Sequence, residues 1–332
     1  MLPNGPAAMT SSDYLRHAVD LTPMDRAIVE ILQRDGRRAY SQIAADIGVT
    51  EKTARRRVQA LLEAGSIHIS AVTDPRTLGY GAAALAGIDL DGTRPAGEVA
   101  EALTAIDAAD YVVVSAGRFA IFLELFARDM AHLSEILDTD VRATPGVGHV
   151  ELFPYLSLYY QQADFGAARE GSDAPGVRAV ELEPLDRRII WELSRDGRAP
   201  YQAIADALEI SEAQVRTRVK RMTEAGAVKV IAIVNPLRYA YGTMAWIGLR
   251  AAPGVRLQSL AEELARLPYC TYVVICTGSL DVFAEVVCRS QEEMLDLLDA
   301  EIRRVPGAEH FEVFLYMDLH YKWLRPLPGA SE

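Results

Sequence analysis

The sequence has little cysteine and no long apolar run. Its three cysteines, Cys270, Cys276 and Cys288, are odd in number and lack a Cys-x-x-Cys spacing. This argues against a disulfide framework and a zinc site, and it predicts buried thiols in a reducing cytoplasm. No stretch approaches the ~18 consecutive apolar residues of a membrane span. The opening residues MLPNGPAAMTSSD have neither a basic nor an apolar region, so we expect no signal peptide, a mobile tail and a cytoplasmic protein.

The sequence also lacks the excess of positive charge that is typical of nucleic-acid binding, because its formal net charge is −12. The charge is unevenly distributed, however. Residues 21–80 contain nine Lys or Arg against seven Asp or Glu, and residues 182–241 contain ten against eight, so each segment carries +2. The remainder then carries −16. Local charge matters more than total charge to a polyanion, so the composition does not exclude a nucleic-acid partner.

The sequence repeats itself at an offset of 161 residues. LTPMDRAIVEILQRDGRRAY from Leu21 corresponds to LEPLDRRIIWELSRDGRAPY from Leu182, and the correspondence continues as far as Tyr160 and Tyr321. So long a period excludes a solenoid and indicates a duplicated domain pair. Residues 161–180 between the copies are rich in Gly, Ala and charge, which predicts a linker.

The first sixty residues of each copy have the pattern of three short helices. In the first copy these are a helix beginning at Thr22-Pro23, a second over Tyr40–Ile47 and a third from Thr50 to about Glu63. Gly48 ends the second helix, and the tight turn that follows it is typical of a helix-turn-helix. The next residues, SIHISAVTDP, alternate in polarity and are predicted to form a wing hairpin.

The third helix of each copy presents cations outward. Apolar residues at helical spacing should face the core, namely Ala54, Val58 and Leu61 in one copy and Val215, Val219 and Met222 in the other. Lys and Arg can neutralise phosphates, Arg can grip guanine edges and Gln can bind adenine, so context and recurrence favour DNA binding over a merely solvated basic face. Arg57 and Arg218 lie beside the core stripe and either brace the fold or touch phosphate. The candidate DNA-binding residues are Lys52, Thr53, Arg55, Arg56, Gln59, Gln214, Arg216, Thr217, Lys220 and Arg221.

The second half of each copy changes to strand-like periodicity. Its order, β-α-β-β-α-β, is the ferredoxin-like arrangement, and the overall class is α+β. Two helices would cover one face of each sheet, and the apolar second face needs another sheet, within the chain or between chains. The predicted organisation is a tail over 1–20, winged helix-turn-helix domains over 21–80 and 181–241, ferredoxin-like effector domains over 81–160 and 242–325, and a linker over 161–180.

These motifs resemble the Lrp/AsnC family of feast/famine transcriptional regulators. The resemblance lies in LTPMDRAIVEILQRDGR, SQIAADIGVTEKTARRRVQALLEAGSI and AVTDPRTLGY, and in their second-copy counterparts, and it covers nearly the whole chain. It implies a DNA-binding regulator that senses an amino acid or a related small molecule. Typical members hold one such unit and dimerise, so this chain is similar to a covalently linked dimer. The resemblance also implies self-association through the effector domains, to about four chains.

In the family, effectors bind near the turn between the middle two strands, where a Gly-x-x-Asp is favoured. The second copy has this pattern from Gly278 to Asp281, whereas the first copy has Ala120 in place of Asp. Asp can hold an ammonium group and Ala cannot, so the two effector sites are expected to be unequal. The alternative is that Asp281 only caps a turn. The candidate effector-binding residues are Thr277, Gly278, Asp281, Gly117 and Arg118.

Other functions have weaker support in the sequence. His149 with Glu151, and His310 with Glu312, lack a third metal ligand nearby, so no metal is predicted. Without a Gly-rich phosphate loop or a nucleophile elbow, neither a cofactor nor an enzymatic activity is predicted. Siroheme decarboxylases share this fold and also occur as fused pairs, but the middle strands lack the His- and Arg-rich stretch expected around a tetrapyrrole. A DNA-binding architectural protein without an effector is a further alternative.

Overall fold

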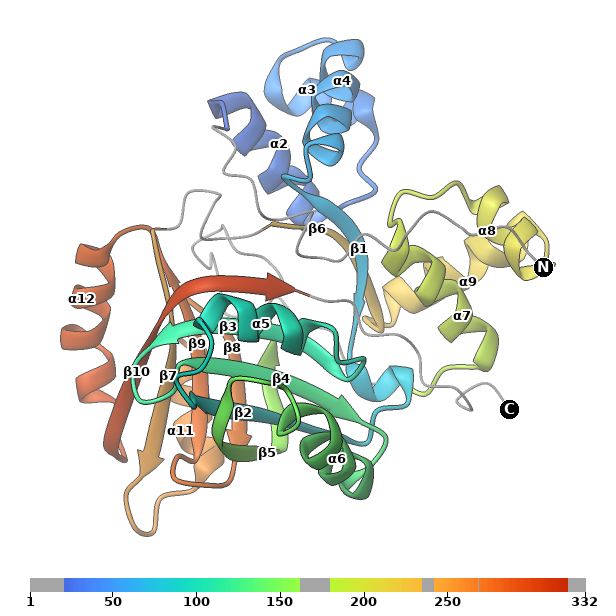
Figure 1. Cartoon of the computed structure of the whole chain (residues 1–332). Helices are drawn as coiled ribbons and strands as arrows, with labels where there is room; N and C mark the ends of the chain where they lie inside the picture. Colours follow the sequence, from blue (N-terminus) through green and yellow to red (C-terminus); the bar gives the residue numbers. More distant parts are fainter. Residues whose placement is uncertain (1–20, 162–179, 235–241, 268, 322–332) are drawn as a thin grey trace.

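Two small helical heads sit on an eight-stranded β-barrel (Figure 1). This computed structural model describes residues 21–161, 180–234, 242–267 and 269–321. The predicted tail over 1–20 and all but the ends of the predicted linker lie outside the described residues. The predicted α+β class is confirmed, with three helices in each head and two ferredoxin-like units in the barrel. None of the helices in the described ranges is long and apolar enough to cross a membrane.

Local signals explain where the helices of the heads begin and end. The Thr22 side chain accepts a hydrogen bond from the Asp25 amide, and Ser211 forms a reciprocal capping box with Gln214. Gly48 ends its helix in the left-handed conformation at φ 71°. The first head comprises α2 (Pro23–Arg34), α3 (Tyr40–Ile47) and α4 (Glu51–Glu63), and the second head comprises α7 (Pro184–Arg195), α8 (Tyr201–Leu208) and α9 (Glu212–Glu224).

The strand after each head pairs with the strand of the other copy. β1 (His68–Thr73) runs antiparallel to β6 (Val228–Ile233), so the wing hairpin expected within a copy is wrong. After β1 the chain turns away instead of returning, because the Asp74 side chain accepts from the Arg76 amide and starts the 3-10 turn η1 (Pro75–Leu78). Each of the two strands also packs against the head of the other copy. Ala232 of β6 lies in the core of the first head, and Ala71 of β1 lies in the core of the second.

Each ferredoxin-like unit contributes four strands to the barrel. The strand orders are β3-β4-β2-β5 in the first unit and β8-β9-β7-β10 in the second. The first unit comprises β2 (Ala82–Leu90), α5 (Ala96–Thr104), β3 (Ala109–Ala116), β4 (Ile121–Ala127), α6 (Met130–Ile136), the π-helical turn η2 (Leu137–Val141) and β5 (Val147–Gln161). The second comprises β7 (Thr243–Ala251), α11 (Leu257–Ala265), β8 (Cys270–Cys276), β9 (Val282–Cys288), α12 (Gln291–Ala300), the 3-10 turn η3 (Ile302–Arg304) and β10 (Ala308–Tyr321).

The long last strand of each unit closes the barrel. β5 pairs with β8 and β10 pairs with β3, both antiparallel, so each unit completes the sheet of the other. The second sheet face that the sequence left without a partner is therefore buried inside the same chain. Closure also removes the free strand edges that would otherwise invite pairing with another chain.

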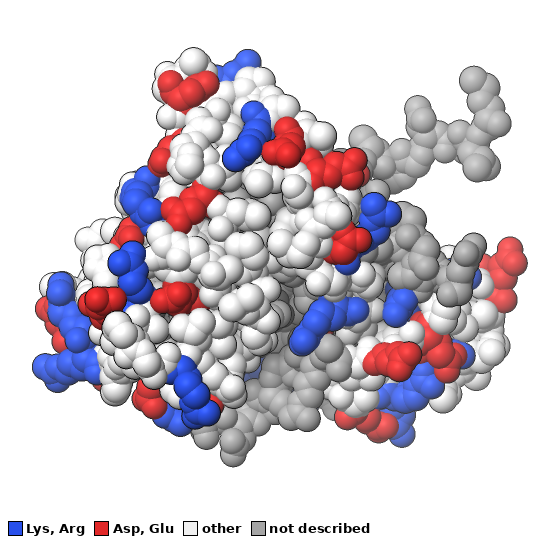
Figure 2. Space-filling view, turned by 90° about the horizontal axis from the view of Figure 1, so that it is seen from below, with Lys and Arg blue, Asp and Glu red and all other residues white. Residues whose placement is uncertain are grey.

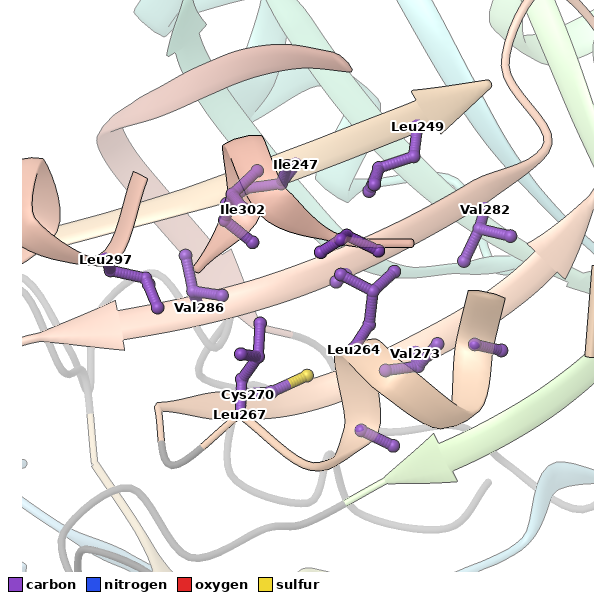
Figure 3. Close-up of a cluster of buried hydrophobic side chains, with 14 of the residues drawn as sticks. Ile247, Leu249, Leu264, Leu267, Cys270, Val273, Val282, Val286, Leu297 and Ile302 are labelled. Carbon is purple, nitrogen blue, oxygen red and sulfur yellow. The ribbon is translucent and has the colours of Figure 1, made fainter. Parts of the chain in front are cut away.

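Aliphatic and aromatic side chains divide between two kinds of core. Outside the barrel, α11 and α12 cover the second sheet through residues such as Leu264, Leu297 and Val286 (Figure 3). Inside the barrel, the two sheets meet through phenylalanines of both copies, and the rings of Phe122 and Phe314 lie 4.8 Å apart. All three cysteines are buried, as expected, and burial raises the pKa of the Cys276 and Cys288 thiols to about 12.

Candidate nucleic-acid interface and effector turns

The third helix of each head, α4 or α9, exposes the side chains predicted to bind DNA. The predicted core positions are buried in both helices, which turns the cationic positions outward. Thr53 is the exception, since it is half-buried and its hydroxyl lies 2.9 Å from that of Thr50. The exposed candidates are Lys52, Arg55, Arg56 and Gln59 on α4, and Gln214, Arg216, Thr217, Lys220 and Arg221 on α9.

A buried carboxylate anchors each third helix to its head. Asp25 is almost fully buried and accepts from Nε of Arg57 at 2.9 Å, and Asp186 accepts from Arg218 at 2.9 Å. Arg57 and Arg218 therefore brace the fold, which is one of the two roles that the sequence allowed. Burial alone would raise the pKa of Asp25, but the hydrogen bonds from Arg57 and Thr22 outweigh it and hold that pKa below its usual value. Arg221 also donates to Asp186, at 2.5 Å.

Each head contributes an arginine that contacts the other head. The Arg37 guanidinium donates to the carbonyls of Gly197 and Ala199 and lies over the Tyr201 ring. Arg198 repeats this arrangement in reverse, donating to the Gly36 carbonyl at 2.8 Å and lying over the Tyr40 ring. Both arginines end the Arg-Asp-Gly-Arg motif found in the two copies. Together with the β1–β6 pair, the exchange fixes the position of one head relative to the other.

The predicted effector turns lie at the joint between the two sheets. Gly117 and Gly278 have φ of 154° and 148°, a conformation that favours glycine. A Cβ on Gly117 would lie 2.8 Å from the Phe314 ring, and a Cβ on Gly278 would lie 2.8 Å from the Phe153 ring. Each turn is therefore packed against the last strand of the other copy.

One arginine links both turns and both last strands. Arg118 donates to Glu151 at 2.9 Å, to Glu312 at 3.1 Å and to the Ser279 hydroxyl at 2.9 Å. The two glutamates occupy equivalent positions of the repeat, whereas Arg118 and Ser279 differ at theirs. A homodimer would place two arginines or two serines here. The fused chain uses one of each, so a single guanidinium bonds to both carboxylates and offsets part of their charge.

The second turn holds the Asp that the first turn lacks. Asp281 is half-buried, and its Oδ2 accepts from the Ala251 amide at 2.9 Å. Arg250 donates to the Ser279 carbonyl from both Nε and an Nη, at 3.1 and 2.9 Å. Thr277 and Gly278 are exposed beside them. A carboxylate has about four acceptor positions, so Asp281 can accept from a ligand as well as from the Ala251 amide.

The paired histidines and glutamates do not gather into a metal site. Arg118 contacts both glutamates, and His310 Nε2 lies 3.7 Å from Glu312 Oε1. Throughout the described ranges, no group of three His, Cys, Asp or Glu side chains is placed to hold a metal ion.

Seen from below, the surface mixes Lys and Arg with Asp and Glu instead of separating them by sign (Figure 2).

Sequence reasoning missed two glutamates inside the barrel. Glu124 accepts from the hydroxyls of Tyr155 and Tyr272 at 2.6 and 2.7 Å, and Glu285 accepts from Thr271 and from two further tyrosine hydroxyls. Burial raises the pKa of Glu124 to about 7, with a further contribution from the charge of Glu285, and burial likewise raises the pKa of Glu285. An acid at the same position of an otherwise apolar strand in both copies was the available signal. We call these groups the Glu–Tyr cluster.

Family comparisons match the same segments. An AsnC-type helix-turn-helix domain matches residues 21–62 and again 182–223, and an Lrp/AsnC ligand binding domain matches residues 83–164. A C-terminal dimeric alpha+beta barrel domain matches residues 255–323. An uncharacterized HTH-type transcriptional regulator of Pyrococcus horikoshii is 31% identical over 45% of this chain and 94% of its own length. The chain belongs to the Lrp/AsnC family.

One further relative matches a single unit of this Lrp/AsnC protein, and one solved structure has a similar two-unit fold. The HTH-type transcriptional regulator LrpA of Pyrococcus horikoshii is 34% identical over 38% of this chain and 89% of its own length, so it corresponds to a single unit. The crystal structure of the siroheme decarboxylase NirDL matches 93% of this chain and 96% of its own, with a TM-score of 0.60 and 17% identity. The two chains are therefore similar in fold over nearly their whole length.

Proposed function

We propose that this Lrp/AsnC protein is a sequence-specific DNA-binding transcriptional regulator built as a fused pseudo-dimer. The observation that carries the proposal is the recurrence of one exposed cationic third helix in each head. The buried Asp–Arg bonds hold both helices in place, and the arginine exchange holds the two heads together. In a helix-turn-helix this helix enters the major groove, so each head can approach a duplex through its third helix.

Selection from a pool of random duplexes tests this function without a known operator. The full chain is expected to enrich a defined motif, and binding of the enriched duplex should weaken steeply as salt rises, since phosphate contacts release counterions. Failure to bind any duplex at low salt as well as at physiological salt would contradict the proposal.

We further propose that the second effector turn binds an amino acid or a related small molecule. Thr277, Gly278 and Asp281 would form the better site, with the Asp281 carboxylate holding the ligand ammonium. The first turn offers Gly117 and Arg118 but has no such carboxylate, so it would bind more weakly.

Titration calorimetry with a panel of amino acids tests the inequality of the turns. Asp281→Asn is the sharpest variant, because an amide oxygen can still accept from the Ala251 amide while the charge is lost. We expect it to abolish the stronger binding event and to leave the melting temperature nearly unchanged. Equal sites in both copies, or unimpaired binding by Asp281→Asn, would refute the assignment.

Self-association through the effector domains, to about four chains in the cytoplasm, completes the proposal. Exposed apolar side chains on the last strands support it, since Leu156 and Met317 occupy equivalent positions of the repeat and are 64% and 66% exposed. Native mass spectrometry of the full chain gives the number of chains, and a monomer at micromolar concentration would contradict this part.

A second candidate function is a tetrapyrrole decarboxylase. The observation that favours it is the full-length match to the two-unit siroheme decarboxylase fold. Incubation with siroheme tests it directly, through a shift of the siroheme Soret absorption band on binding and through release of CO₂. Turnover in this assay would favour the enzyme, whereas its absence together with DNA binding would favour the regulator.

A further inference from the structure

The two third helices place their cations on different turns. α4 carries Lys52 and Arg56 in its first half, where α9 has Ala213 and Thr217. In the second half the pattern reverses, because Lys220 and Arg221 of α9 stand where α4 has Gln59 and Ala60. Arg55 and Arg216 are equivalent. In a helix-turn-helix the N-terminal residues of this helix contact base edges, so the first half is the part that can specify sequence.

Ion pairs widen this difference. Arg55 and Arg216 pair alike with the glutamate four residues before each, but on α9 Lys220 also lies 3.8 Å from Glu224 and Arg221 is drawn back to Asp186. Asp186 is fully buried, so its pairing with Arg221 is less weakened by solvent than an exposed pair would be. On α4, no carboxylate of the described ranges pairs with Lys52 or Arg56. These two side chains are available to a duplex at no cost in broken ion pairs.

A further candidate for base contact on α9, Gln214, is held in a capping box. Gln214 Oε1 accepts from the Ser211 amide at 3.0 Å and from the Ser211 hydroxyl at 3.1 Å, as part of the capping box. Turning this amide toward a base would give up both bonds to Oε1, although the Ser211 hydroxyl would still accept from the Gln214 backbone amide. Apart from Arg216, which has its equivalent in Arg55, and the short side chain of Thr217, the first half of α9 therefore offers little to distinguish one base from another.

We infer that the heads are functionally unequal: α4 contacts base edges through Lys52 and Arg56, and α9 mainly holds phosphates. This rests on the proposed DNA-binding function and adds which half of the site is specified. Because the β1–β6 pair and the exchanged arginines Arg37 and Arg198 fix the heads relative to each other, the specified half lies at a constant distance from the phosphates held by α9. The target is then an asymmetric site with one strongly specified half.

The motif that the full chain enriches from random duplexes tests the inference first. One conserved half beside a weakly conserved half is the expected result. A palindrome with two equally conserved halves would overturn the inequality of the heads while leaving the DNA-binding function intact. Failure to enrich any duplex would overturn the DNA-binding function, and this inference with it.

Matched double variants show which head contacts which half of the DNA site. Lys52→Ala with Arg56→Ala should reduce the ratio of affinities for the enriched and a scrambled duplex by about 5- to 150-fold per lost base contact. Arg216→Ala with Lys220→Ala also removes two exposed cations, but it should weaken both duplexes alike and lower the salt slope by about 2. Equal loss of discrimination by the two variants would refute the assignment.

A gain-of-function variant tests the same assignment with a result that loss of folding could not produce. Ala213→Lys with Thr217→Arg gives α9 the cations of α4 at two exposed positions. The motif enriched by this variant should show a second conserved half, while its melting temperature stays near that of the parent chain. An unchanged motif would contradict the role given to these positions.

Discussion

Glu124→Gln should remove a pH dependence of stability that the buried carboxyl creates. Glu124 lies inside the barrel and is held by tyrosines of both copies, Tyr155 and Tyr272. Because its pKa is raised in the folded state, the fold binds the proton more tightly than the unfolded chain does. Its contribution to stability is therefore present at low pH and is lost as pH rises from about 4.5 to about 7.

The size of the effect follows from the two pKa values. A tenfold change in an ionisation equilibrium is worth about 1.4 kcal/mol, so a rise from 4.5 to about 7 corresponds to about 3 kcal/mol. Gln has nearly the same shape and can still accept from the tyrosine hydroxyls, but it does not titrate. The difference in free energy of unfolding between parent and variant reports Glu124 together with its coupling to Glu285, because the titrations of more distant groups cancel.

Urea unfolding followed by tryptophan fluorescence measures that difference, and Trp246 is a buried reporter within the barrel. We expect the parent chain to lose about 3 kcal/mol relative to Glu124→Gln between pH 5 and pH 8. Tyr155→Phe is the control, since removing a hydrogen bond that lowers the pKa of Glu124 should move the loss to higher pH. Parallel pH profiles for the parent and Glu124→Gln would refute the reasoning.

Three further predictions concern stability. Arg57→Ala leaves the buried Asp25 carboxylate without its main partner and should lower the free energy of unfolding by about 3 kcal/mol or more at pH 7. A loss of less than about 1 kcal/mol, measured by urea titration, would contradict this. Because the pKa of Asp25 is lowered in the parent chain, the stabilisation from its charge is lost as pH falls below about 4, so the difference in free energy of unfolding between the parent and Arg57→Ala should narrow in acid; a difference that stays constant between about pH 7 and about pH 3 would contradict this. Gly278→Ala brings a Cβ to 2.8 Å from a phenylalanine ring at φ 148° and should cost about 1–3 kcal/mol by thermal melting, where an unchanged melting temperature would contradict the packing.

The parts of the fold that local signals determine were predictable from the sequence. Thr22-Pro23, Gly48 and the Ser211–Gln214 box act within four residues, and the helices begin or end where these motifs predict. It was also predictable that each ferredoxin-like sheet buries both of its faces. Its two helices cover one face, and the apolar second face needs another sheet. The exchange of β1 and β6 was not, because alternation shows that one strand face is buried but not which strand is its neighbour.

The candidate sites show the same division. The cationic face of α4 follows from helical spacing and was predictable, as was the absence of Asp at Ala120. The contacts of Arg118 with both last strands were not, because they join segments up to 194 residues apart. The Glu–Tyr cluster lies between these cases. Its acids stand out in the sequence, whereas their tyrosine partners become apparent only once the two sheets are closed into a barrel.

Genome-wide footprinting with the full chain, beginning at the gene's own upstream region, tests the central claim most directly. The claim is that one polypeptide supplies both heads of a DNA-binding pair. We expect protected sites that span two successive major grooves and share one asymmetric motif. Absence of any protected DNA, even at low salt, would contradict the DNA-binding role of the two heads.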